Sequence, residues 1–198
     1  MSLILQSSGG GQITIQEPTT ASTFTQTLPA VTGTIITTGN RPAGSVLQVV
    51  TVNKTDTFSM ASATWTDVTG LSLSITPSST SNKILISASI ALSSSSDFSY
   101  IRLLRNSTVI DVGDAVGSRP QVTGAASYPA ASPQYMLFQI PVTYLDSPAT
   151  TSAVTYKFQL RNGTTGSTAY INRTSSDRDT ADYEWRTPSN IVLMEIAA

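Results

Sequence analysis

Near its middle the chain reads Lys83-Ile84-Leu85-Ile86-Ser87-Ala88-Ser89-Ile90-Ala91-Leu92. Apolar side chains occupy every second position from Ile84 to Leu92, and most positions between them hold Ser or another small side chain. A period of two is typical of a β-strand that turns one side to a core, because successive side chains of a strand point to opposite faces. We therefore predict a strand over residues 83–92, which is the most regular strand pattern in the chain.

Shorter segments of the same kind occur on both sides of this strand. The triplet Arg105-Asn106-Ser107 separates two of them and predicts a hairpin. No segment shows the 3.6-residue period of an amphipathic helix. About eight to ten short strands at this spacing are typical of a two-sheet sandwich, so residues 44–198 are predicted to form an all-β jelly roll. The other predicted strands are 46–53, 65–77, 100–104, 108–112, 135–142, 154–160, 169–172 and 191–196.

Residues 113–133 are predicted to form a long loop, because Gly, Pro and small side chains interrupt them repeatedly. Loops of this length are often functional. Arg119 and Tyr128 are its main large side chains, so they are candidates for contact with a receptor or a neighbouring subunit. The alternative is that the loop packs down across the sandwich.

The first 43 residues differ in composition from the rest, since Glu17 and Arg41 are their only charged side chains. Short strand patterns occur at 3–6, 12–16, 23–28 and 34–37, separated by Gly- or Pro-containing turns. A segment with so few large apolar side chains rarely folds alone. We therefore expect residues 1–43 to be an extended arm that packs against other copies of the chain or a neighbouring protein.

The chain contains no Cys and no His. Disulfides, thiolate metal sites and Cys nucleophiles are thereby excluded, as is a Ser-His-Asp triad. The commonest general base and metal ligand is also missing. We accordingly expect a protein that is not an enzyme and that needs no cofactor or metal.

Charged residues make up 12% of the chain and the net charge is −1. A nucleic-acid partner is not expected, because phosphate binding requires clustered Lys and Arg. No apolar run is long enough to cross a bilayer. The N-terminal Met1–Gln6 lacks the basic and apolar regions of a secretory signal. We therefore expect synthesis without a signal peptide and no membrane insertion.

Residues 172–186 hold an unusual concentration of charge. One interpretation is that this loop binds an ion, with calcium ligands from Asp177, Asp179 and Asp182. The spacing, however, lacks the Gly and distal Glu of an EF-hand. The favoured interpretation is a loop whose charges compensate one another, or salt bridges between subunits. No metal site is predicted. The charged side chains are Arg173, Asp177, Arg178, Asp179, Asp182, Glu184 and Arg186.

Trp185 lies beside these charges in the sequence. Exposed aromatic side chains often mark binding surfaces, whereas a buried Trp would only cap or fill the sandwich. Both interpretations stay open for Trp185. Together with the charged loop, it forms a candidate interaction surface.

Eight ordered segments carry a resemblance to a known group of proteins. They are Gly11–Ile15, Glu17–Ser22, Thr27–Thr34, Gly70–Pro77, Ser81–Ile86, Leu145–Thr151, Tyr170–Thr174 and Ile191–Ile196. These segments resemble those of virion proteins of tailed phages, especially marine and cyanobacterial phages. The body also looks like the trimeric jelly roll of the tumour-necrosis-factor and complement-head type. The resemblance implies a homotrimeric protein on the virion surface that is made in a host cytoplasm.

The expected function is that of a capsid decoration (cement or head-fibre) protein that binds and stabilises the shell. The expected partners are other copies of the chain and the major capsid or tail proteins, with a host receptor as a further candidate. One alternative is a tail-fibre or receptor-binding tip, for which the chain is short. A second alternative is a secreted carbohydrate-binding lectin, which would share the jelly roll but predicts a signal peptide.

Overall fold

The computed structural model describes residues 2–6, 9–16, 41–95, 98–127, 133–163 and 165–198. The chain divides into two compact units, Met1–Ile35 and Ile36–Ala198. Each unit is described by itself below.

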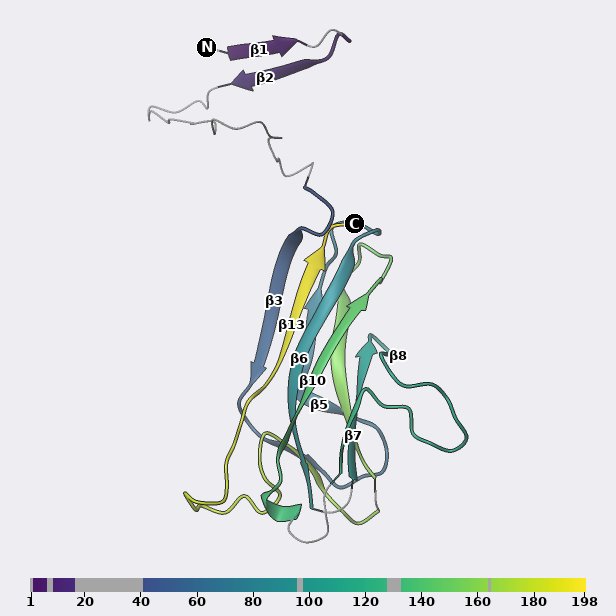
Figure 1. Cartoon of the computed structure of the whole chain (residues 1–198), viewed down its shortest axis with the longest axis vertical. Coiled ribbons are helices and arrows are strands. Elements are labelled where there is room, and N and C mark those ends of the chain that lie inside the picture. Colours follow the sequence, from purple (N-terminus) through teal and green to yellow (C-terminus); the bar gives the residue numbers. More distant parts are fainter. Residues whose placement is uncertain (1, 7–8, 17–40, 96–97, 128–132, 164) are drawn as a thin grey trace. The chain divides into compact units, whose positions relative to one another are not determined.

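The described part of the first unit is a hairpin of two strands, β1 (Ser2–Gln6) and β2 (Gln12–Gln16). The strands are antiparallel and pair from Ser2 with Gln16 to Gln6 with Gln12 (Figure 1). Gly10 has a φ of 83°, a conformation that glycine adopts without steric cost. The predicted strands at 3–6 and 12–16 are thus confirmed, while those at 23–28 and 34–37 lie outside the described residues.

In the described residues of the second unit, every regular element is a strand except the short 3-10 helix η1 (Pro133–Tyr135). The prediction of an all-β body is therefore confirmed. Its strands are β3 (Val46–Lys54), β4 (Phe58–Met60), β5 (Thr66–Ile75), β6 (Lys83–Ser94), β7 (Phe98–Arg105), β8 (Thr108–Ile110), β9 (Gly124–Ser127), β10 (Phe138–Asp146), β11 (Val154–Asn162), β12 (Ala169–Ile171) and β13 (Ser189–Ile196).

Two antiparallel sheets form a sandwich. In the first sheet the order is β3-β13-β6-β10, and β12 and β4 prolong it past the end of β13. In the second sheet the order is β5-β11-β7, and β8 and β9 both pair with the free edge of β7. The pairs β3–β13, β5–β11, β6–β10 and β7–β8 are nested in the sequence. This nesting is how a long β-hairpin rolls up, and it makes the sandwich a jelly roll as predicted.

The core lies between the two sheets. The apolar side of residues 83–92 faces this core, as predicted. Ile84, Ile86 and Ile90 of β6 are fully buried. They lie in one hydrophobic cluster with Tyr156 and Phe158 of β11 in the opposite sheet. Burial of such large side chains contributes roughly 1.5–3 kcal/mol each.

Two strands were not predicted, and both are short. β9 lies inside residues 113–133, so the prediction of one long loop there is wrong for Gly124–Ser127. Its Gly-Ala-Ala-Ser sequence carries no strand signal, and the strand forms because it pairs with β7. A Cβ on Gly124 would lie 2.5 Å from Cγ2 of Ile140, so only glycine fits where β9 approaches the first sheet. The other unpredicted strand is β4.

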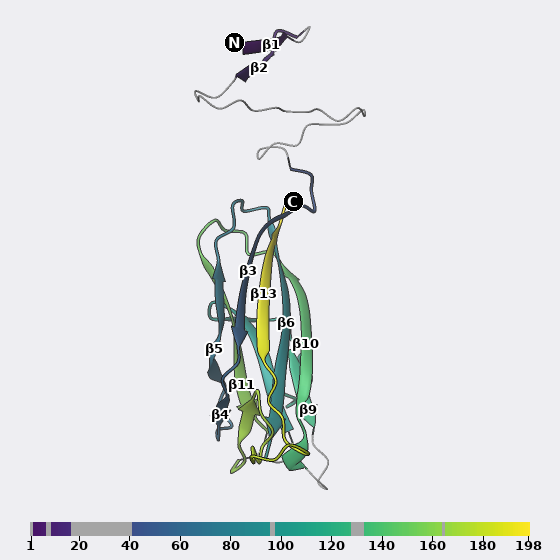
Figure 2. The ribbon, with the colours of Figure 1, turned by 90° about the vertical axis from the view of Figure 1, so that its left-hand side faces the viewer.

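The second unit has two distinct ends. At one end the chain enters, and the backbone N–H of Gly44 donates to the carbonyl of Ala197 at 2.9 Å. The connection between β12 and β13, residues 172–188, lies at the opposite end of the sandwich together with η1 (Figures 1 and 2). Among the described residues, no helix is long and apolar enough to cross a membrane.

Candidate functional site

The outer face of the first sheet is almost free of charge. Outward positions on β13 and β6 alternate with buried ones and hold Asn, Ser and apolar side chains. Lys83, at the start of β6, is the only charged side chain at these outward positions of the four long strands. One apolar row crosses all four strands, because Leu145 pairs with Leu85, Leu85 with Met194, and Met194 with Val49.

The outer face of the second sheet is different, since it carries a network of charged and amide side chains. Nζ of Lys157 lies 2.6 Å from a carboxylate oxygen of Asp67. The amide of Gln159 donates to the same carboxylate at 2.7 Å and accepts from Arg102 at 2.6 Å. Hydrogen bonds from Lys157 and Gln159 hold the pKa of Asp67 below its usual value. A solvated face is normally built in this way, whereas the first sheet offers no such network.

The β12–β13 loop begins and ends on a rigid base. Buried Asn172 adopts a left-handed φ of 67°, which Asn tolerates better than most residues. Its amide donates to the carbonyls of Lys54 and Asp56, and its oxygen accepts from the hydroxyl of Ser189 at 2.6 Å. Arg173 and Arg186 then form an antiparallel bridge that closes the loop.

Asp177 joins the two arginines of that bridge. Its carboxylate lies 2.7 Å from Arg186 and 2.8 Å from Arg173. These hydrogen bonds, first that of Arg186 and then that of Arg173, outweigh partial burial and hold the pKa of Asp177 below its ordinary value. The guanidinium of Arg173 also stacks 4.2 Å from the ring centre of Tyr170 on β12. The base of the loop is therefore cross-linked by charge.

Glu184 forms a second cluster at the tip of the loop. Its carboxylate accepts from the hydroxyls of Thr174 and Ser176 and lies 3.1 Å from Nε of Arg178. Burial opposes the charge, but these donors together keep the pKa of Glu184 below its usual value. Arg178 donates in addition to the hydroxyl of Tyr135 in η1 at 2.8 Å. The loop tip is thereby tied to a segment about 40 residues earlier in the chain.

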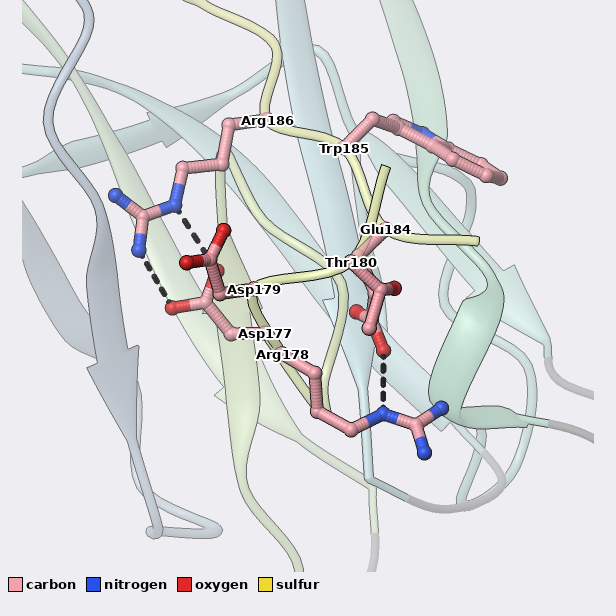
Figure 3. A pocket seen from close by; sticks show the side chains of 7 residues that line it. All are labelled: Asp177, Arg178, Asp179, Thr180, Glu184, Trp185 and Arg186. Atoms are coloured by element: carbon pink, nitrogen blue, oxygen red, sulfur yellow. Dashed lines mark hydrogen bonds and ion pairs between the residues drawn. The ribbon is translucent and has the colours of Figure 1, made fainter. Parts of the chain in front are cut away.

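Between these two clusters lies a hollow of about 350 Å³ (Figure 3). Trp185 stands at its rim with 48% of its surface exposed. Tyr183 is 60% exposed but does not line the hollow. The lining side chains are Asp177, Arg178, Asp179, Thr180, Glu184, Trp185 and Arg186.

The hollow is lined by five predicted surface residues (Asp177, Arg178, Asp179, Trp185 and Arg186) and by Glu184, which also belongs to the predicted charged loop. Arg173 forms an ion pair with Asp177. Asp182 is exposed and lies outside the lining. Arg119 belongs to the β8–β9 connection, where its N–H donates to the carbonyl of Val116, and it does not join the hollow. Tyr128 lies outside the described residues. Sequence reasoning did not select Thr180 or Tyr135, because neither carries a motif and the second is distant in the sequence.

The calcium hypothesis finds no geometric support in the described part of the chain. No three acidic or other ligand-type side chains gather there closely enough to hold a metal ion. The first of the three candidate ligands, Asp177, instead forms ion pairs with two guanidinium groups. In these contacts, carboxylates and guanidinium groups of the same loop neutralise one another.

No family model and no curated protein matches this chain. Solved structures that resemble it include a mutant VP2 protein of infectious bursal disease virus in derived T=1 particles, with 14% identity over 95% of this chain, 43% of that chain and a TM-score of 0.38. A structure of the Gx strain of the same virus gives 16% identity, the same coverages and a TM-score of 0.37. This chain spans less than half the length of those chains. With identities and TM-scores this low, the likeness carries no conclusion about what this chain binds.

Proposed function

We propose that this chain is a non-enzymatic structural protein on the outside of a phage virion, where a homotrimer binds and stabilises the capsid as a decoration protein. Residues 1–43 attach the trimer to the shell, and the jelly roll forms the body. The sequence resemblance to tailed-phage virion proteins supports the virion assignment. The main support for a homotrimer is the contrast between the outer face of the first sheet, which is almost free of charge, and the charged outer face of the second sheet.

The uncharged face is suited to contact with another copy of the chain. Interface centres are depleted in charged residues, since a charge buried without a partner is costly. The row from Leu145 to Val49 includes side chains that are 47% and 55% exposed in the single chain. A closed ring with threefold symmetry would cover this face in every copy and would leave the charged face of the second sheet in water.

A charge on the uncharged face tests the assembly. Thr51 is exposed on the outer side of β3, so Thr51→Glu leaves the sandwich of the single chain intact. Light scattering after gel filtration should give about three times 20.9 kDa for the wild type and a smaller species for the variant. The matched control is Ser72→Glu, at an exposed position of β5 in the second sheet, which should remain trimeric. A monomeric wild type, or equal behaviour of the two variants, would refute this interface.

Deleting residues 1–35 tests the attachment. The remaining residues form the second compact unit and contain the whole described core, so they should still fold and assemble. Purified particles lacking the protein should bind the full chain but not the truncated one in a sedimentation assay. If the truncated chain sediments with particles as well as the full chain does, the N-terminal segment is not the anchor.

A receptor-binding tip of a tail fibre is the second candidate function. The observation in its favour is the end-to-end arrangement of the body. The N-terminal segment joins at one end near Ala197, while the loop with exposed Tyr183 and Trp185 lies at the opposite end. A protein anchored through its N-terminus would present this loop to its surroundings in either placement.

A further inference from the structure

The exposed indole of Trp185 does not contribute to the core of the sandwich. The core of the sandwich is filled by side chains from β5, β6, β7, β11 and β13, and Trp185 is not part of it. Large aromatic side chains that stay exposed beside a concave surface often serve as binding platforms. Trp185 lines the hollow together with carboxylate, hydroxyl and guanidinium side chains. Its indole extends to one side of them (Figure 3).

The polar groups of the hollow fall into two sets. Asp177 is paired with Arg186, and Glu184 is paired with Arg178, so these four side chains are held in place. The side chains of Asp179 and Thr180 are exposed and have no partner among the described residues. The hollow therefore combines a fixed wall with one free carboxylate and one free hydroxyl.

We propose that this hollow binds a neutral saccharide. A sugar ring offers a face of C–H bonds that stacks on the negative face of an indole. Its hydroxyls are both donors and acceptors, so they can donate to Asp179 and exchange hydrogen bonds with Thr180 and the outer N–H groups of Arg186. The carboxylates of Asp177, Asp179 and Glu184 are balanced by the guanidinium groups of Arg173, Arg178 and Arg186, so the hollow has no net charge that would attract an acidic sugar.

The size and the position of the hollow agree with this ligand. About 350 Å³ lies at the lower end of the range for small-molecule sites and suits one or two sugar rings. The site lies at the end of the body opposite the entry of the N-terminal segment, so a bound glycan would not obstruct attachment there. This inference goes beyond the proposed structural function and does not depend on the trimer or on capsid placement.

The full chain should be applied to an array of immobilised neutral and acidic glycans that includes bacterial surface polysaccharides. We expect retention on neutral glycans, with at least about a tenfold loss in Trp185→Ala, as for a truncated aromatic hot spot. Asp179→Ala should also weaken the binding of neutral glycans. Tyr183→Ala is the matched control, because Tyr183 is an aromatic side chain of the same loop that is more exposed than Trp185 but does not line the hollow. This variant should bind as the wild type does.

Thermal melting of each variant separates a local loss of binding from unfolding, since all three replaced side chains are exposed and the melting temperature should stay unchanged. Retention on acidic glycans alone would overturn the proposal. So would the absence of any retained glycan, or equal retention of the wild type and Trp185→Ala.

Discussion

At the scale of single residues, Glu195 is a carboxylate that is 1% exposed near the end of β13. All four of its hydrogen bonds come from uncharged donors. The backbone N–H and the hydroxyl of Ser78 donate at 2.6 and 2.7 Å, and the amides of Asn82 and Gln48 both donate at 2.6 Å. Burial works against the charge, but these donors hold the pKa of Glu195 below its ordinary value. The carboxylate thus fastens the β5–β6 connection to the last strand.

Replacing this carboxylate should weaken the fold in a pH-dependent way. Because the pKa of Glu195 is lower in the folded chain, its contribution is present above the unfolded value of about 4.3 and is lost as the pH falls through the folded value. We expect Glu195→Gln to lower the free energy of unfolding by about 1–3 kcal/mol at pH 7. Urea unfolding at pH 7 and pH 3 should show a smaller difference between variant and wild type at the lower pH. An unchanged difference would contradict the role assigned to the charge.

Buried polar residues such as Glu195 can be predicted in part from the sequence. An inward-facing Glu that follows Ile191 and Leu193 at the same spacing breaks the apolar pattern and signals a buried polar contact. Its partners could not be predicted, because Gln48, Ser78 and Asn82 lie more than 100 residues away along the chain. The same holds for the contact of Arg178 with Tyr135, which only the folding of the body brings together.

At the scale of elements, strands with a clear alternation were predictable and short strands of small residues were not. β9 exists because its backbone completes the edge of β7, and Gly124 lets it lie against Ile140. The side chains of Gly124–Ser127 do not by themselves indicate that β9 pairs with β7. The β12–β13 loop was predictable as a charged segment, but its hollow depends on which arginine pairs with which carboxylate.

Gly124→Ala tests the packing of β9. The added Cβ would lie 2.5 Å from Ile140 and 3.3 Å from Ile101, so the sheets must shift or the strand must leave. We expect a loss of about 1–3 kcal/mol in the free energy of unfolding, typical of overpacking. Gly113→Ala is the control, since nothing lies within 4 Å of a Cβ there, and it should unfold like the wild type. Equal stability of both variants would show that β9 is not packed in this way.

At the scale of the whole molecule, the jelly roll follows from the number and spacing of alternating segments, whereas assembly depends on surfaces that a single strand does not reveal. Residues 83–92 predict which side faces the core, and only the paired sheets show that the other side joins an uncharged face across β3, β13, β6 and β10. The two outer faces are therefore the structural basis for expecting several copies side by side. The proposed placement on a capsid makes a separate prediction about stoichiometry.

The most direct test is the number of copies of this chain per purified phage particle, measured against the major capsid protein by quantitative mass spectrometry. A decoration protein should be present at a ratio approaching that of the shell protein. A ratio of a few per cent would contradict the decoration role and favour a fibre, and absence from purified particles would contradict the virion assignment itself.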